Sequence, residues 1–262
     1  MNLSGQCALI TGSTSGIGLG IAEALAAAGA NVVLNAFTDG DEDRALAEDI
    51  ARRHGVEAAY VRADMRRPEE CAALVAEAAR RFGPVGVLVN NAGIQHVAPV
   101  EDFPPDKWDA ILAVNLSSAF HTIRAAVPMM REAGRGRIVN IASVHGLTAS
   151  PYKSAYVAAK HGIVGLTKAV ALELARAGDI TANAVCPGYV LTPLVEAQIP
   201  DQMRTHGMGR KEVIEKVMLE RQPTREFVTV KAVGAMVVYL CSDEARQVTG
   251  QAMTIDGGWT AL

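Results

Sequence analysis

Cysteine is scarce in this sequence of 262 residues, and the cysteines it has follow no pattern. They are Cys7, Cys71, Cys186 and Cys241. Residues so far apart fit neither a disulfide framework nor a structural metal site, so we predict free thiols, no metal and a reducing, cytoplasmic location. An excess of basic residues is also lacking. The formal net charge of −3 predicts no broad surface for nucleic acid.

Long apolar runs are missing as well. The apolar run from Ala232 to Cys241 is about half as long as the roughly twenty residues that a membrane-spanning helix needs. Near the start, the polar Ser4 and Gln6 stand where a secretory leader would need an apolar core. We therefore expect no membrane partner. Half of the composition is apolar, which can bury the core of one α/β domain or of two small ones.

Short apolar segments alternate with helical patterns along most of the chain. The expected strands are Cys7–Ile10, Val32–Leu34, Ala58–Val61, Val85–Val89, Ile138–Ser143, Ile180–Cys186 and Met253–Ile255. This alternation is typical of a Rossmann-type, doubly wound α/β fold. We predict a seven-stranded parallel sheet in a single domain over residues 1–262.

The segment 191–228 breaks the alternation. Three prolines, Pro193, Pro200 and Pro223, surround a charged, helical stretch that precedes the last helix and strand. We expect this segment to stand over the strand ends as a mobile helical lid on the substrate. The alternative is a surface excursion without a role.

A glycine-rich loop follows the first strand. Residues 11–18 read TGSTSGIG, and apolar residues then recur at helical spacing from Ile17 onward. Glycine lets the backbone approach a ligand closely, and the N–H groups and dipole of a helix N-terminus attract phosphate. A loop between a strand and a helix is the context that dinucleotide binding requires. An ordinary strand-to-helix turn with glycines for packing is the alternative.

The residues after the second strand bear on the type of cofactor. The stretch Asn35–Gly40 contains no Arg or Lys that could pair with a 2′-phosphate, and neither does the glycine-rich loop. NAD is therefore favoured over NADP by elimination, with Asp39 as a displaced acid. After the third strand, Asp64 is placed either to accept a hydrogen bond from the adenine amine or to cap the helix that Pro68 opens.

Tyr156 and Lys160 stand four residues apart on one face of a helix that Ser154 is expected to cap. A phenol with a pKa of about 10 is a poor base, and a nearby ammonium lowers that pKa. Such a pair can move a proton to or from a substrate oxygen. On an earlier helix, Asn115 lies in an apolar stripe. It is either a satisfied core amide or marks a kink that frees a carbonyl for a chain of waters.

Five features together carry a family resemblance. They are Thr11-Gly-x-x-x-Gly-x-Gly18, Asn90-Asn-Ala-Gly93, Asn115, Ser143 and Tyr156-x-x-x-Lys160. In this combination the chain resembles the short-chain dehydrogenase/reductase family over its whole length. The resemblance implies that Tyr156 is the general acid/base and that Ser143 binds the substrate oxygen. It also implies that Lys160 lowers the pKa of the phenol and binds the nicotinamide ribose, while Asn115 positions a water.

The same resemblance implies the cofactor and the assembly. NAD carries the hydride, so the protein supplies placement and electrostatics. A homotetramer built through the catalytic helix and the helix before it is implied as well. The residues implied to bind NAD are Gly12, Thr14, Ser15, Gly16, Ile17, Gly18, Phe37, Asp64, Met65, Asn91, Ala92, Gly93, Tyr156, Lys160, Pro187, Gly188, Val190 and Thr192.

Within the family, several segments resemble the members that interconvert (R)-3-hydroxybutyrate and acetoacetate, a small hydroxy acid and its keto acid. The segments are Asn91–His96, Ile141–Leu147, Lys153–Tyr156, Thr192–Glu196 with Gln198, and Asp256–Trp259. The implied substrate-binding residues are Gln95, Ser143, His145, Lys153, Tyr156, Tyr189, Gln198 and Trp259. A carboxylate needs cations or donors, and Lys153 and His145 can both be positive. Tyr189 departs from the resemblance, because these members carry tryptophan there.

Two other functions stay open. The first is a reductase of 3-oxoacyl thioesters or of sugars on the same scaffold, although the polar Lys153 and His145 argue against a long acyl chain. The second is a non-catalytic protein that senses NAD by binding it. The presence of Ser143, Tyr156 and Lys160 together argues against a protein that only binds the dinucleotide.

Overall fold

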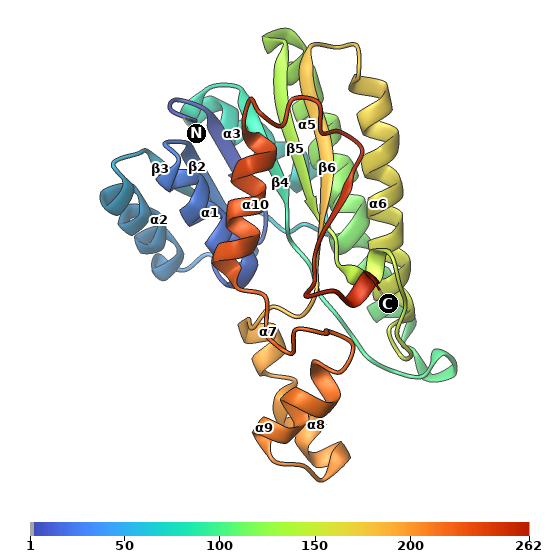
Figure 1. Cartoon of the computed structure of the whole chain (residues 1–262). Coiled ribbons are helices and arrows are strands. Elements are labelled where there is room, and N and C mark those ends of the chain that lie inside the picture. The colour runs from blue at the N-terminus through green and yellow to red at the C-terminus, as the bar shows by residue number, and fades with distance from the viewer. Residues whose placement is uncertain (1–2, 262) are drawn as a thin grey trace.

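Seven parallel strands form the centre of the molecule, whose computed structural model describes residues 3–261. The strands are β1 Cys7–Ile10, β2 Asn31–Ala36, β3 Ala58–Arg62, β4 Val85–Asn90, β5 Arg135–Ile141, β6 Asp179–Pro187 and β7 Ala252–Ile255. Their order is β3-β2-β1-β4-β5-β6-β7, and every neighbouring pair is parallel (Figure 1). The predicted Rossmann-type, doubly wound sheet is confirmed. Its strand order reverses between β1 and β4, which is where such sheets bind ligands.

Helices join most of the strands. The longer ones are α1 Gly16–Ala27, α2 Asp41–His54, α3 Pro68–Phe82, α4 Pro105–Leu112, α5 Ser118–Ala133, α6 Ser154–Leu174 and α10 Val230–Cys241. The residues at the two ends of α2 show why such segments are helical. It carries acidic residues in its first turn and basic residues in its last, which complements the helix dipole. Gly55 then ends the helix with a left-handed backbone at φ +67°.

The helices cover both faces of the sheet. Side chains alternate along each strand, so Ala8 and Ile10 pack in one core with α1 and α10. Cys7 and Leu9 point to the other face and pack in a second core with α3, α5 and α6. All four of these β1 residues are buried, as expected for a central parallel strand. The carboxyl ends of the strands are therefore the part of the sheet left open for a site.

The helical run Pro105–Ala133 is long and apolar enough to cross a membrane by length and composition, a property that the sequence analysis did not single out. It consists of α4, a π-helical turn over Ala113–Ser117, and α5. α5 packs against α3, β4 and β5, and buries Ile123, Ala126 and Met130. The apolar side of this run is thus accounted for by the core of the fold.

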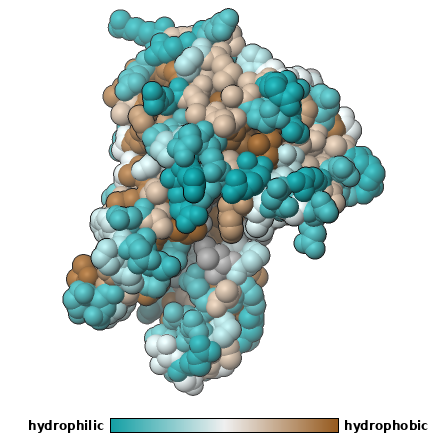
Figure 2. All heavy atoms as spheres, turned by 180° about the vertical axis from the view of Figure 1, so that it is seen from behind, coloured by the Kyte–Doolittle hydropathy of each residue, from teal (hydrophilic) through white to brown (hydrophobic). Residues whose placement is uncertain are grey.

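Three short helices form a small lobe between β6 and α10. They are α7 Pro193–Glu196, α8 Ile199–His206 and α9 Arg210–Val213, followed by a π-helical turn over Ile214–Met218. Figure 1 shows the lobe projecting away from the sheet, and Figure 2 shows a mostly hydrophilic tip. At its base, Val190 and Val228 form an isolated parallel bridge, and the N–H of Val228 donates to Tyr189 O at 2.9 Å. The bridge brings the two ends of the segment 191–228 together.

Several predicted strand ends differ from the structure. Most strands extend one or two residues further than expected, but β5 ends at Ile141, two residues before Ser143. The Ser143 hydroxyl accepts a hydrogen bond from the N–H of His145 at 3.2 Å and so opens a turn instead. The predicted thiols are confirmed, because all four cysteines are free and buried.

The predicted cap at Ser154 is wrong, and the cap that was one alternative for Asp64 is not formed. Lys153, not Ser154, occupies the cap position of α6, and within residues 3–261 the buried Ser154 hydroxyl has no hydrogen-bond partner. Asp64 does not cap α3, because Arg67 takes that position. The Asp64 carboxylate instead binds the backbone and guanidinium of Arg66, two residues on.

Candidate active site

The glycine-rich loop leaves β1 and enters the N-terminus of α1. Gly12 and Gly16 have φ of +60° and +55°, a left-handed backbone that favours glycine. A Cβ on Gly12 would lie 2.8 Å from Ala92 Cα, and one on Gly18 would lie 2.3 Å from Gly12 O. α1 has no acidic residue in its first turn, and Ser15 makes no side-chain cap. The loop is a tight cradle whose backbone N–H groups fit a phosphate, so the residues present suit a dinucleotide.

The end of β4 fixes the shape of this cradle. Asn91 Nδ2 donates to Gly12 O at 2.7 Å and to Thr11 O at 3.0 Å. The Thr11 hydroxyl in turn accepts from the N–H groups of Asn91 and Ala92 at 3.0 and 3.1 Å. The side chain of Asn91 therefore holds the loop, and the adjoining Gly93 lies beside Asn115.

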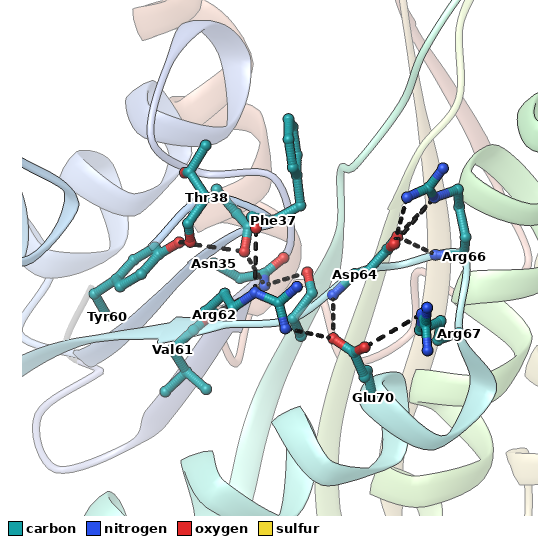
Figure 3. A network of polar contacts seen from close by, with 12 residues as sticks. Asn35, Phe37, Thr38, Tyr60, Val61, Arg62, Asp64, Arg66, Arg67 and Glu70 are labelled. Atoms are coloured by element: carbon teal, nitrogen blue, oxygen red, sulfur yellow. Dashed lines mark hydrogen bonds and ion pairs between the residues drawn. The ribbon is translucent and has the colours of Figure 1, made fainter. Parts of the chain in front are cut away.

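The ends of β2 and β3 lie side by side (Figure 3). The Asn35 side chain joins the loop to both strands, because its Oδ1 accepts from the N–H of Gly12 and its Nδ2 donates to Val61 O. Phe37 follows β2 with 71 % of its surface exposed. Asp64 follows β3, and the guanidinium of Arg66 lowers the pKa of its carboxyl. An exposed aromatic ring and a charged carboxylate at these strand ends suit an adenosine group.

The stretch Asn35–Gly40 contains no cation, but two arginines from other elements reach it in space. Arg62, the last residue of β3, donates from Nε to Phe37 O at 3.3 Å. Arg44 reaches the same region from α2 and forms an ion pair with Asp39. Arg62 is itself paired, because its Nη1 lies 3.2 Å from Glu70 Oε2. The linear sequence missed these arginines because they come from the next helix and strand, not from the residues that follow β2.

Ser143, Tyr156 and Lys160 come together where β5 ends and α6 begins. The Ser143 and Tyr156 side chains line one cavity, and hydrogen bonding by Ser143 acts to lower the pKa of the phenol. Lys160 Nζ lies 5.6 Å from the centre of the Tyr156 ring and donates to Ile141 O at 2.7 Å. Burial lowers the pKa of Lys160 to about 8. The cluster therefore holds a hydroxyl, a phenol and an ammonium, which are the groups that proton transfer to an alcohol oxygen needs.

The pKa of Tyr156 is raised, whereas the helical spacing predicted a lowered value. Burial disfavours the phenolate, and this effect outweighs the hydrogen bond with Ser143, which acts in the opposite direction. The ammonium of Lys160 is held by the main-chain carbonyl of Ile141 rather than by the phenol oxygen. Desolvation is thus the larger influence on Tyr156 in this structure.

Asn115 is a satisfied core amide that also lies in a distorted part of its helix. It lies at the centre of the π-helical turn, so the helix is distorted there as one interpretation required. Its side chain is also a satisfied buried amide, because Oδ1 accepts from the N–H of Ile94 and Nδ2 donates to Ile94 O, both at 2.9 Å. Asn115 therefore fixes the loop after β4 to the helix that precedes α5.

A cavity of about 110 Å³ lies beside the Ser143–Tyr156 pair. Tyr189 and Trp259 form an aromatic wall with ring centres 5.7 Å apart, and Lys153 Nζ lies 5.9 Å from the Tyr189 ring centre. The cavity is lined by all eight predicted substrate-binding residues, Gln95, Ser143, His145, Lys153, Tyr156, Tyr189, Gln198 and Trp259. Besides Tyr156, which belongs to both sets, four predicted cofactor residues line it, namely Ile17, Gly188, Val190 and Thr192. The two predicted sets of residues therefore meet in one place.

The expected positive charge on His145 is wrong at neutral pH. Burial, helped by the charge of Lys153, lowers the pKa of His145 to about 4. The neutral ring lies with Nε2 2.8 Å from Ser150 Oγ and Nδ1 3.4 Å from Ser143 Oγ. His145 is thus a hydrogen-bonding group that braces Ser143. Among the cavity-lining residues described, this leaves Lys153 as the candidate cation, with a pKa that burial lowers.

Three residues of the site were missed by the sequence analysis. Val144 and Val195 line the cavity as apolar walls. Their position in the sequence could have identified them, because Val144 lies between Ser143 and His145, and Val195 lies in the first turn of α7. Ser150 has no such signal, since it contacts His145 from an irregular loop. No group of three or more metal-binding side chains is found within residues 3–261.

Comparison with known proteins places the chain among oxidoreductases. The family model described as enoyl-(acyl carrier protein) reductase matches residues 12–260. The D-beta-hydroxybutyrate dehydrogenase of Rhizobium meliloti strain 1021 is 58 % identical, covering 98 % of this chain and 99 % of that protein. The protein of the same name from Cupriavidus necator is 54 % identical and covers 99 % of both.

A solved structure shares the fold over the full length of both chains. It is a variant of actinorhodin polyketide ketoreductase with NADPH, which is 38 % identical with a TM-score of 0.92. The matching family model, the relatives, the doubly wound sheet and the grouped Ser143, Tyr156 and Lys160 agree. This chain belongs to the short-chain dehydrogenase/reductase family.

Proposed function

We propose that this oxidoreductase interconverts (R)-3-hydroxybutyrate and acetoacetate and uses NAD as its nicotinamide cofactor. Two relatives that are more than half identical over nearly their whole length carry the name D-beta-hydroxybutyrate dehydrogenase. The observation that carries the proposal is the placement of Lys153 in a small cavity with Ser143 and Tyr156. A lysine suits a carboxylate, and a volume of about 110 Å³ suits a short acid rather than a long acyl chain.

The proton chemistry falls to residues of this chain. Bound NAD supplies the hydride acceptor and a positively charged ring. Tyr156, as phenolate, takes the proton of the substrate hydroxyl, while Ser143 holds the same oxygen by a hydrogen bond. Lys160 stabilises the phenolate electrostatically, which opposes the effect of burial on its pKa. Asn115 holds the adjoining loop and positions the water that passes the proton to solvent.

The substrate carboxylate is held by side chains from separate parts of the fold. Lys153 supplies the charge, with Gln95 from the loop after β4 as a further donor. His145 stays neutral and keeps Ser143 in place. Gln198 comes from the lobe, so movement of residues 191–228 as a lid over a single domain would bring it to the substrate and exclude water.

The preference for NAD rests on charge at the end of β2. Arg44 and Arg62 are both paired with carboxylates there, and those carboxylates repel a 2′-phosphate. We expect catalytic efficiency, kcat/KM, to be much higher with NAD than with NADP. The ketoreductase of similar structure has NADPH, so kcat/KM has to be measured with both cofactors. Equal values of kcat/KM with NAD and NADP would refute the preference.

We also propose a homotetramer in the cytoplasm. Phe120 on α5 and Leu172 on α6 are large apolar side chains with 49 % and 79 % of their surface exposed, which suits packing between subunits through these helices. Four free thiols suit a reducing compartment. Light scattering of the purified protein tests the assembly, because a monomer would show that these faces are not interfaces.

One panel of substrates tests the proposed activity. NADH formation is followed with (R)-3-hydroxybutyrate, its coenzyme A thioester and simple secondary alcohols. We expect the free acid to be used at least about a hundredfold more efficiently than the others. Higher efficiency with the thioester would favour the reductase alternative. Binding of NAD without turnover of any substrate would favour a protein that senses the cofactor.

A further inference from the structure

The end of β2 carries a positive charge that NAD does not need. Arg62 Nε donates to the carbonyl of Phe37, the first residue after β2, so its guanidinium lies across that strand end (Figure 3). In doubly wound folds this strand end receives the ribose 2′ position of a dinucleotide. Arginine is also the side chain best suited to a 2′-phosphate, because its planar donors pair with two oxygens at once. Arg62 is therefore placed for a group that NAD lacks.

Glu70, from the first turn of α3, holds Arg62 in place. Its Oε2 lies 3.2 Å from Arg62 Nη1 and accepts the backbone N–H of Asp64 at 2.8 Å. Arg67 Nε lies 3.5 Å from the other oxygen. The hydrogen bond from the backbone fixes the carboxylate at the end of β3, and its side chain is 25 % exposed. Glu70 is thus a fixed negative charge beside the position of the 2′ group.

We infer that Glu70 sets the choice of nucleotide, because it occupies Arg62 and repels a 2′-phosphate. This inference rests on the proposed preference for NAD and names the residue that enforces it. A second pair at this strand end, Arg44 with Asp39, has the more open carboxylate, because Asp39 is 62 % exposed and Glu70 25 %, while the two arginines are similarly exposed. Solvent screens such a pair, so it contributes less to the choice. When the charge of Glu70 is removed, Arg62 is free to bind a 2′-phosphate.

Glu70→Gln tests the inference with little change of shape. Glutamine keeps an oxygen for the Asp64 N–H and loses only the charge. Dissociation constants are measured calorimetrically for AMP and for adenosine 2′,5′-bisphosphate, which differ by the 2′-phosphate. We expect the ratio of the two constants to shift about tenfold toward the bisphosphate in Glu70→Gln. Adding Arg62→Met should remove that shift.

Glu77→Gln is the matched control. Glu77 lies on the same helix, is also paired with two arginines, and its loss changes the net charge equally. In Glu77→Gln, the ratio of the dissociation constants for AMP and the bisphosphate should stay within about twofold of the wild-type ratio. Glu70→Asp is a second test variant, because it keeps the charge but shortens its reach to Arg62, and it should give a smaller shift in the same direction.

The outcomes separate this inference from the proposal beneath it. A wild type that binds the bisphosphate more tightly than AMP would show that the preference for NAD is itself wrong. A wild type that prefers AMP, with an unchanged ratio in Glu70→Gln and in Glu70→Asp, would overturn only the role of Glu70. Equal shifts in Glu70→Gln and Glu77→Gln would overturn it too, since net charge would then be the cause. A shift that survives Arg62→Met would refute Arg62 as the receiving cation.

Discussion

Replacing Lys153 by alanine should separate charged substrates from uncharged ones. Its ammonium lines the same cavity as Ser143 and Tyr156, and the other basic side chain in the lining, His145, has a pKa of about 4. A hydrogen bond to a charged group contributes about 1.5–3 kcal/mol, or about ten- to a hundredfold in affinity. We expect KM for (R)-3-hydroxybutyrate to rise by that factor. A fall in kcat should accompany it, because the carboxylate orients the reacting carbon.

The assay compares the acid with its methyl ester in wild type and in Lys153→Ala. The ester has no charge for Lys153 to pair with, so its efficiency should change little in the variant. Lys168→Ala provides the control, because Lys168 is exposed on the same helix and its removal changes the net charge equally. It should behave as wild type with both substrates.

Equal losses of kcat/KM for acid and ester in Lys153→Ala would show that Lys153 shapes the cavity but does not bind the carboxylate. The assignment of a hydroxy acid would then depend on the relatives alone.

Three further predictions concern single side chains. Tyr156→Phe should lower kcat by about 10²–10⁴-fold while NAD binding, measured by fluorescence titration, stays near the wild-type value; near-normal turnover would eliminate the proposed acid/base. His145 has a pKa of about 4 in the folded chain and 6.5 in its ordinary state, so as the pH falls the unfolded chain is protonated at His145 before the folded chain is. The free energy of unfolding should therefore fall by up to about 3 kcal/mol as the pH drops from 6.5 to 4, and urea titrations should show a smaller fall in His145→Gln. Tyr152 has φ +67°, so Tyr152→Gly should stabilise the fold by about 1 kcal/mol, whereas Tyr152→Ala, which keeps a Cβ, should not; equal stabilities would argue against strain there.

The fold follows from the sequence because its strands are buried on both faces. Segments such as Cys7–Ile10 are therefore continuously apolar and bounded by turn residues, a local signal. Strand ends are less predictable, because they depend on contacts between segments. Ser143 leaves β5 since its hydroxyl binds the N–H of His145, which apolar patterning does not reveal.

The membership of the candidate site was predictable, but its charges were not. The eight predicted substrate residues line one cavity, because their segments lie beyond strand ends, at the start of α6 and, for Gln198, in the lobe. Protonation depends on burial, which exists only in the folded chain. Burial makes His145 neutral and raises the pKa of Tyr156, against both predictions from residue type. Arg62 contacts the end of β2 from β3, so the residues that follow β2 along the chain gave no indication of it.

The most direct test of the account is the product balance with each enantiomer of 3-hydroxybutyrate. Acetoacetate and NADH are quantified together in reactions with the (R) and the (S) acid. We expect one acetoacetate for each NADH from the (R) acid and almost no product from the (S) acid. With the carboxylate on Lys153 and the hydroxyl on Ser143 and Tyr156, as proposed, only one enantiomer directs its hydride toward the nicotinamide. No acetoacetate from the (R) acid, or equal rates with both enantiomers, would contradict the proposed function.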